Sequence, residues 1–341
     1  MENKFSLQFG QLPQSYIYRK FDLDRITDDF SLDFPLSRIY IICGVRGSGK
    51  TVLLTDVGKR FSKKEEWIVV DVNPNRSILE QIASGIYETE SVKHLFLSAS
   101  FSFHGLGFSI KGKTPVSNIK TILEKMLSVV KKHNKKVLIT IDEVSNNGYM
   151  RSFAHDFQSL LREDYPIYTV MTGLYENVNS LQNNKNLTFL YRAPKIDLKP
   201  LNIDLVKEEY RVIFEEESSE TIDSLANLTK GYAFAYQVVG YLFSKYKDID
   251  KIYNELDQYL SVYVYEKIWS NLPTAEKKIL KTFVTDTNTT EVILKATAYS
   301  SKVYSVYRDR LIKRGLVTSY LYGELKLVLP RFENFIVKQP Q

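Results

Sequence analysis

The feature of this sequence that most constrains its fold is the glycine-rich octapeptide Gly44–Thr51, which reads GVRGSGKT. An unbroken apolar run, Ile39–Cys43, comes directly before it and is typical of a strand buried in a parallel sheet. A helical pattern from Lys50 to about Phe61 follows. A strand, a tight glycine-rich turn and a helix in this order predict the first repeat of an α/β domain.

The alternation of strand and helix continues to about residue 200. Residues 94–112 alternate and contain three glycines, which predicts a β-hairpin or a lid-like insertion. We therefore expect a three-layer α/β domain over residues 1–200, with helices on both faces of a mainly parallel sheet. The further strands are expected at Trp67–Val72, Lys136–Ile141, Ile167–Met171 and Asp197-Leu198, and the further helices at 77–87, 116–133 and 150–162.

The pattern changes after Pro200. Residues 202–271 are helical without strand-like alternation, which predicts an all-helical domain over 201–271. Three helical stretches and two short strands follow and predict a winged helix over 272–341. The helices are expected at 274–286, 289–298 and 300–314, with Ser300 or Ser301 as an N-cap and Gly315 after the last one, and the strands at Leu316–Tyr320 and Glu324–Leu329.

The octapeptide matches the P-loop pattern, in which a glycine-rich loop wraps around the phosphates of a nucleotide. Backbone N–H groups and the N-terminus of the following helix both point at the phosphates. Lys50 supplies positive charge to the β- and γ-phosphates, and the Thr51 hydroxyl is a ligand for Mg²⁺. The pattern thus predicts ATP and Mg²⁺ as ligands. The residues expected at the nucleotide are Gly44, Val45, Arg46, Gly47, Ser48, Gly49, Lys50, Thr51 and Val52.

A second motif, Val137–Glu143, combines a buried strand with two carboxylates at its carboxyl end. Asp142 is expected to hold Mg²⁺, mostly through water, and Glu143 to polarise the water that attacks the γ-phosphate. Asp71 also ends a strand, but no glutamate follows it. We therefore interpret Asp71 as a residue at the sheet edge near the site.

Three more polar residues are candidates for the same site. Thr172 follows the strand Ile167–Met171, so its hydroxyl could orient the water or contact the γ-phosphate. The alternative is a strand-end hydroxyl that caps the turn before Gly173. Asn146 and Asn147 follow the acidic pair and could also face the γ-phosphate.

These motifs resemble those of the AAA+ and STAND-type P-loop ATPases, especially the prokaryotic branch related to archaeal ATPases and to origin-recognition initiator ATPases. The resemblance covers nearly the whole chain and implies ATP hydrolysis, a helical lid domain and a C-terminal winged helix. It rests on Gly44–Thr51, Ile139–Glu143 and Met171–Gly173, and it continues through Tyr191–Pro194, Ile196–Leu201 and Gly231–Gln237.

The chain departs from the pattern of this family in its adenine-contacting and lid segments. The family often has a Gly-Arg pair near the adenine, whereas this chain has Tyr16–Lys20, without glycine. Ile17 and Arg19 are the candidate contacts there. The lid segment Gly231-Tyr232-Ala233 has neither the sensor arginine of AAA+ lids nor the proline of STAND lids.

An arginine finger has two candidates in this sequence. Arg192 matches the family position best, and Arg162 is the other. Either arginine could instead be a salt-bridge residue.

The excess positive charge is confined to the C-terminal part of the chain. The chain has a net charge of +6, and residues 273–341 contain 12 Lys or Arg and 6 Asp or Glu, so the remainder is neutral. This asymmetry suggests an anionic partner, namely duplex DNA, for the winged helix, with a protein partner as the alternative. In the helix 301–314 the packing side is expected to hold Val303, Tyr304, Val306, Tyr307 and Leu311, and the opposite side Ser305 and Asp309 together with the proposed phosphate contacts Lys302, Arg308 and Lys313.

The remaining composition favours a cytoplasmic protein. A single cysteine, Cys43, forms no internal disulfide, and four scattered histidines show no metal-ligand spacing. The N-terminus lacks the layout of a signal peptide, and no apolar run approaches the roughly 20 residues of a membrane helix. A homo-oligomer is compatible with the sequence.

Two functions fit these observations. The first is a switch in which ATP closes the lid, repositions the winged helix on a partner, and is then hydrolysed to ADP and phosphate. The second is an interaction protein that holds ATP as a structural ligand with negligible turnover. A small-molecule kinase fits less well, because the chain has no second glycine-rich substrate loop.

Overall fold

The computed structural model describes residues 3–8, 12–98, 101–104, 107–110, 118–184 and 188–340. The chain forms two compact units. We call Arg19–Cys43 with Lys50–Asp197 the sheet unit, and Met1–Tyr18 with Gly44–Gly49 and Leu198–Gln341 the helical unit. The glycine-rich loop is therefore grouped with the helical unit up to Gly49, while Lys50 begins a helix of the sheet unit.

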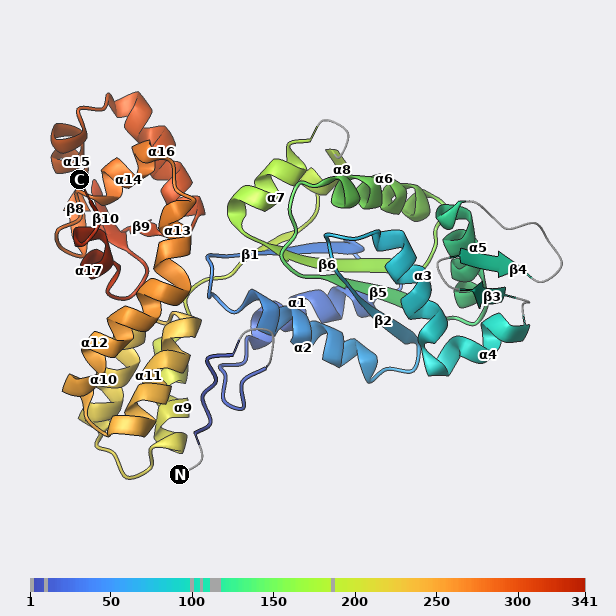
Figure 1. Cartoon of the computed structure of the whole chain (residues 1–341), viewed down its shortest axis with the longest axis horizontal. Coiled ribbons are helices and arrows are strands. Elements are labelled where there is room, and N and C mark those ends of the chain that lie inside the picture. Colours follow the sequence, from blue (N-terminus) through green and yellow to red (C-terminus); the bar gives the residue numbers. More distant parts are fainter. Residues whose placement is uncertain are drawn as a thin grey trace. The chain divides into compact units, whose positions relative to one another are not determined.

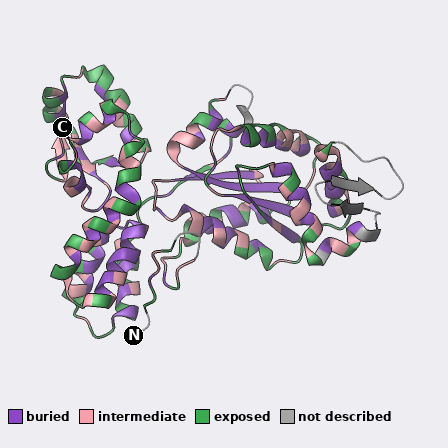
Figure 2. Cartoon of the chain, viewed as in Figure 1, coloured by how far each residue is buried: buried purple, intermediate pink, exposed green. Residues whose placement is uncertain are grey.

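The sheet unit is built on five parallel strands in the order β2-β5-β6-β1-β7. Apolar β-branched runs form the central strands because both faces of the sheet are covered, and β1 and β6 are buried throughout (Figure 2). The order places β6 between β1 and β5. The strands are β1 (Ile39–Cys43), β2 (Trp67–Val72), β5 (Lys136–Ile141), β6 (Ile167–Gly173) and β7 (Lys195–Asp197).

Helices cover both faces of this sheet, as expected (Figure 1). On one face Phe30 of α1 and Phe61 of α2 pack against Trp67, and Phe30 also packs against Tyr40 and Tyr168. On the other face Ile41, Ile139 and Met171 belong to one core with α3, α5 and α6. The helices of the unit are α1 (Lys20–Ser31), α2 (Lys50–Ser62), α3 (Ile78–Glu88), α4 (Glu90–Ser98), α5 (Ile119–Lys132), α6 (Gly148–Arg162), α7 (Tyr175–Gln182) and α8 (Thr188–Tyr191).

The segment expected to be a hairpin or insertion, residues 94–112, is only partly strand. Residues up to Ser98 belong to the helix α4. The strands β3 (Phe101–His104) and β4 (Gly107–Ile110) do pair antiparallel. Gly105 and Gly112 lie outside the described residues.

The helical unit begins with a bundle and ends in a winged helix, which has a three-stranded antiparallel sheet in the order β8-β10-β9. The bundle helices are α9 (Ile203–Ile213), α10 (Ser219–Thr229), α11 (Ala233–Tyr246), α12 (Ile249–Leu260), the π-helical turn η1 (Ser261–Tyr265) and α13 (Glu266–Ser270). The winged-helix elements are α14 (Thr274–Leu280), β8 (Thr287–Thr289), α15 (Thr290–Thr297), α16 (Ser301–Lys313), β9 (Val317–Ser319), β10 (Glu324–Leu327) and α17 (Phe332–Val337).

The helix expected over 274–286 ends early, at Leu280. The Thr282 hydroxyl donates to the Ile279 carbonyl, and the Asn288 amide donates to the carbonyl of Thr282. These bonds end the helix and direct the chain toward the strand β8. All three residues of β8 are polar, so the sequence shows no alternation of apolar and polar residues that would predict a strand there. The Ser300 side chain does cap α16, as expected.

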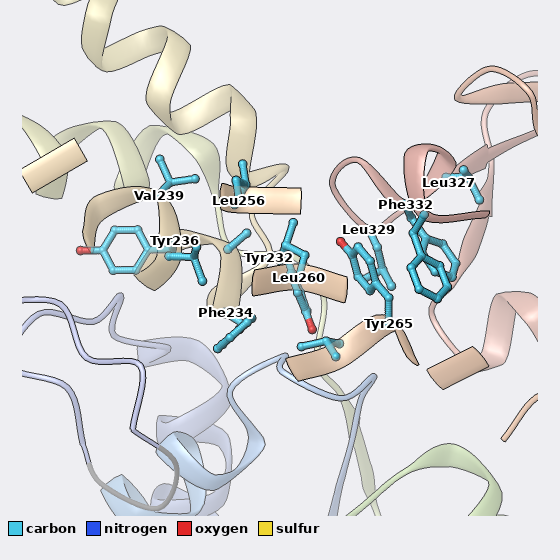
Figure 3. Packing of buried hydrophobic residues seen from close by; sticks show 14 of the residues in the cluster. Tyr232, Phe234, Tyr236, Val239, Leu256, Leu260, Tyr265, Leu327, Leu329 and Phe332 are labelled. Carbon is cyan, nitrogen blue, oxygen red and sulfur yellow. The ribbon is translucent and has the colours of Figure 1, made fainter. Parts of the chain in front are cut away.

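Bundle and winged helix share one hydrophobic core (Figure 3). The ring centroids of Tyr265 and Phe332 lie 4.8 Å apart. The Tyr265 hydroxyl donates to the Pro330 carbonyl at 2.5 Å. The guanidinium of Arg331 makes two hydrogen bonds to the carboxylate of Asp257 on α12. Side chains this closely packed favour movement of bundle and winged helix as one body. The division into domains at residues 200 and 271 stays a prediction.

The single cysteine, Cys43, is buried at the end of β1. Burial is the main cause that raises the pKa of its thiol to about 11, and the nearby Asp197 carboxylate adds to it. Cys43 is therefore protonated at neutral pH and is a packing residue of the core. Among the described residues no helix is both long and apolar enough to cross a membrane.

Candidate functional site

The order of the parallel strands brings three of the predicted site residues together at the carboxyl edge of the sheet. Thr51 lies in the first turn of α2, Asp142 follows β5, and Thr172 lies near the end of β6. The Thr51 hydroxyl donates to Asp142 Oδ2 at 2.8 Å. The Thr172 hydroxyl donates to the other oxygen, Asp142 Oδ1. Both carboxylate oxygens of Asp142 are thus held by side chains from neighbouring elements.

Thr172 is fully buried, and its hydroxyl is used twice. Besides donating to Asp142 it accepts the backbone N–H of Glu143 at 3.1 Å. A hydroxyl has one proton to donate, so Thr172 cannot donate to a phosphate while it donates to Asp142. In this geometry Thr172 positions the acidic pair.

Glu143 adopts a left-handed backbone conformation, with φ of 54°. This conformation costs a side-chain-bearing residue about 1–2 kcal/mol, because its Cβ crowds the following carbonyl oxygen. The Glu143 N–H donates to Thr172 Oγ1 and to Asp142 Oδ1, both at 3.1 Å, and these two bonds hold the conformation. The residue is exposed. Strain of this kind concentrates at functional sites, because the surrounding structure must hold it in place.

The P-loop glycines adopt the conformations that the motif requires. Gly47 and Gly49 have φ of 78° and 91°, which residues with a Cβ rarely adopt. Lys50 follows as the first residue of α2 and is 8% exposed. A buried lysine at a helix N-terminus is a charge placed where an anion is expected.

The loop residues up to Gly49 pack within the helical unit. The Tyr232 hydroxyl donates to the carbonyl of Arg46, and the Phe234 N–H donates to the carbonyl of Gly47 at 3.1 Å. Val45 is half-buried against the core of this unit. Sequence reasoning missed these contacts, since only the position of Tyr232 in the lid segment Gly231–Gln237, to which the family resemblance extends, drew attention to it.

The residues around Thr51 and Asp142 fit Mg²⁺. Magnesium takes oxygen ligands and is usually held by one or two carboxylates, water and substrate phosphates. Thr51 and Asp142 offer a hydroxyl and a carboxylate in direct contact. Among the described residues no group of three His, Cys, Asp or Glu could hold a metal ion.

Asp71, Asn146 and Asn147 have structural partners. Asp71 lies on the edge strand β2 and accepts the Thr140 hydroxyl at 2.9 Å, so the interpretation as a sheet-edge residue is confirmed. The Asn147 side chain caps α6 by accepting the Met150 N–H. The Asn146 amide donates to the Ser180 carbonyl and hydroxyl. These bonds make Asn146 and Asn147 loop anchors, and the suggestion that they face the γ-phosphate stays untested.

The two arginine-finger candidates lie in different places. Arg192 follows α8, is exposed, and has no ion-pair partner among the residues described. Arg162 is the last residue of α6, a helix that starts just after the carboxyl end of β5 and runs back to the amino end of β6. Fifteen helical residues span about 22 Å, so the topology places Arg162 away from the site.

The candidate adenine contacts fall in different units. Ile17 is half-buried against the core of the helical unit, in a segment that Gln237 holds by donating to the Ser15 carbonyl at 2.7 Å. Arg19 precedes α1 in the sheet unit and pairs with Asp22 at 3.8 Å. Val52 is half-buried in α2. Their contact with a nucleotide stays a prediction.

The packing side predicted for α16 is partly wrong. Tyr304 and Leu311 are buried, but Val303 is 41% and Val306 47% exposed. Val306 follows Tyr304 by two residues, or about 200° around the helix, so the two cannot share a face. Arg308 lies only about 40° from Tyr304, is half-buried, and donates to the Ser319 hydroxyl at 3.0 Å.

The outer face of α16 therefore combines apolar and charged residues. Lys302 and Lys313 are exposed, and Lys313 pairs with Asp309 at 2.7 Å. Of the three predicted phosphate contacts, Arg308 and Lys313 thus have partners within the chain.

Comparisons with known proteins agree with this fold. A Walker-type ATPase of Pyrococcus abyssi superposes with a TM-score of 0.64 at 12% identity, over 95% of this chain and 96% of that one. The ORC2 protein of Aeropyrum pernix, solved in ADPNP-ADP complexes, superposes with a TM-score of 0.57 at 14% identity, over 97% and 95%. The chain has the fold of these ATPases.

The sequence comparisons reach less far. Residues 262–336 match a family described as a domain of unknown function (DUF8462). This match runs from within the π-helical turn η1 through α13 and the winged helix into α17. No curated protein matches the chain by sequence.

Proposed function

We propose that this chain is a Mg²⁺-dependent ATPase that works as a switch, with the nucleotide bound by the P-loop Gly44–Thr51. The observation that carries the proposal is the cluster at the edge of the sheet, in which Thr51 and Thr172 hold both oxygens of Asp142. The positive φ values of Gly47 and Gly49 support it, since they allow loop N–H groups to converge on phosphate. ORC2, which shares the fold, was solved with ADPNP and ADP.

Each residue of the site has a proposed task. Lys50 binds the β- and γ-phosphates as a positive charge. Thr51 and Asp142 hold Mg²⁺, which supplies positive charge to the phosphate oxygens. Glu143 orients the attacking water and accepts its proton, while Thr172 keeps Asp142 and the Glu143 backbone in place. Arg192 remains a candidate for stabilising the transition state.

We propose three functional domains: an ATPase domain (1–200), a lid (201–271) and a winged helix (272–341). The shared core and the Arg331–Asp257 ion pair support transmission from lid to winged helix, because both would move as one body. The γ-phosphate would distinguish the two states of the switch, since a ligand shifts an equilibrium only through differential affinity.

Phosphate release by the purified chain, alone and with duplex DNA, tests this function. We expect slow release that requires Mg²⁺ and that is faster when the partner of the winged helix is present. Tight ATP binding without release above the protein-free background would instead favour the rival function, an interaction protein that holds ATP. The exposed Val303 and Val306 support that rival, because apolar side chains on α16 suit a protein partner.

Duplex DNA is the partner that we propose first, bound through Lys302, Arg308 and Lys313. We expect weak binding with little sequence preference, and a dissociation constant that rises with salt. Each phosphate that a lysine neutralises contributes about 0.9 to the slope of the logarithm of the association constant against the logarithm of the salt concentration. Replacing both Lys302 and Lys313 by alanine should therefore reduce the magnitude of this slope by up to about 2. The control is Lys251→Ala, which replaces an exposed lysine on α12. Affinity that does not change with salt would exclude DNA as the partner.

A further inference from the structure

The start of α11 holds the P-loop by its backbone carbonyls. Two consecutive loop carbonyls are bound: that of Arg46 by the Tyr232 hydroxyl and that of Gly47 by the Phe234 N–H at 3.1 Å. Both donors come from the chain where it enters α11 (Figure 3). All four residues belong to the helical unit.

Fixing a carbonyl fixes the next N–H group along the chain. The peptide unit is planar and trans, so the N–H of a residue points opposite to the carbonyl of the residue before it. The bond from Tyr232 to the Arg46 carbonyl therefore sets the direction of the Gly47 N–H. The bond from Phe234 to the Gly47 carbonyl sets that of the Ser48 N–H in the same way, and this N–H donates to the Val45 carbonyl at 3.2 Å, within the loop. Backbone N–H groups of a P-loop cradle phosphate, so the Gly47 N–H is the candidate phosphate donor of these two.

The contact is close and buried. Tyr232 is 5% exposed, and a Cβ on Gly47 would lie 2.1 Å from the Tyr232 hydroxyl oxygen. Burial raises the pKa of Tyr232 well above its ordinary value, so the hydroxyl keeps its proton and remains a donor. Gly47 is thus required both by its φ and by the tyrosine beside it.

Tyr232 and Phe234 also belong to the core that the bundle shares with the winged helix. If the Arg46 carbonyl moves, it therefore pulls on the hydroxyl of Tyr232, which is itself a side chain of this core. No arginine is needed for this link.

We propose that Tyr232 aims the Gly47 N–H donor at the nucleotide phosphates while Phe234 holds the next peptide of the loop, and that Tyr232 is the residue through which the lid senses phosphate. The proposal rests on the proposed function, because it concerns the same P-loop. Tyr232 is a positioning residue, since it acts on phosphate through the Arg46 carbonyl. It takes the place of the sensor arginine that this lid lacks.

Calorimetric titration of full-length Tyr232→Phe with Mg·ADP and with inorganic pyrophosphate tests the proposal. Loss of one hydrogen bond that orders the cradle should weaken binding about five- to ten-fold. The factor should be the same for both ligands, because the effect lies in the phosphate cradle. Tyr210→Phe is the matched control: Tyr210 is buried in the same unit and donates to a backbone carbonyl of α11, that of Tyr236, at 2.8 Å.

A selective loss in Tyr232→Phe, with Tyr210→Phe binding like the wild type, would support the proposal. Equal affinities in all three proteins, or equal losses in both variants, would overturn it while leaving nucleotide binding itself established. Failure of the wild type to bind Mg·ADP would instead refute the proposed function.

Amide hydrogen exchange of the wild type gives a second test that does not depend on the folding of a variant. Mg·ADP should slow exchange in the peptide that covers residues 232–236, because the Phe234 N–H is bonded to the loop. Unchanged exchange in this peptide at saturating Mg·ADP would contradict the sensing role.

Discussion

Replacing Glu143 by glutamine is expected to lower the rate of ATP hydrolysis by about 10²- to 10⁴-fold while nucleotide binding stays unchanged. Glutamine keeps the size of the side chain but cannot accept the proton of the attacking water. The backbone of residue 143 should keep its left-handed conformation, because Thr172 Oγ1 and Asp142 Oδ1 bind its N–H irrespective of the side chain. Single-turnover phosphate release, measured beside an ATP titration, separates the two effects.

Glu163→Gln is the control for this variant. Glu163 is an exposed glutamate at the C-terminal end of α6, near the amino edge of the sheet. The Glu163→Gln variant should hydrolyse ATP at the rate of the wild type. Full activity of Glu143→Gln would show that another group activates the water and would remove the role assigned to this residue.

Replacing Lys50 by alanine is expected to weaken ATP binding by about 100-fold or more. Hydrogen bonds from charged groups contribute about 1.5–3 kcal/mol each, and Lys50 is the charge placed at the N-terminus of α2 for the β- and γ-phosphates. The control variant Lys59→Ala replaces an exposed lysine near the other end of the same helix and should bind ATP normally. Equal affinity of Lys50→Ala and wild type would mean that ATP binds elsewhere or without the P-loop.

The sheet and the residues at its carboxyl edge could be predicted because each depends on local sequence. The apolar runs at 39–43 and 136–141 mark strands by themselves, and Asp142 follows the second one directly. The order of the strands could not be read in the same way. Pairing of β6 with both β1 and β5 joins segments more than 25 residues apart, and only this pairing brings the Thr172 hydroxyl to Asp142.

Features that depend on tertiary contacts were missed or misjudged. The left-handed backbone of Glu143 is held by Thr172, a residue 29 positions away. The bond between Tyr232 and the Arg46 carbonyl joins residues 186 positions apart, and no periodicity encodes it. The exposure of Val306 is different, since helical geometry alone separates it from Tyr304, so that error was avoidable.

The most direct test of ATP binding at the P-loop is a calorimetric titration of the full-length chain with Mg·ATP, with Lys50→Ala measured alongside. The expected result is saturable binding of one nucleotide per chain by the wild type, and a loss of about 100-fold or more in affinity in Lys50→Ala. No saturable binding by the wild type, or binding that Lys50→Ala leaves unchanged, would contradict nucleotide binding at Gly44–Thr51.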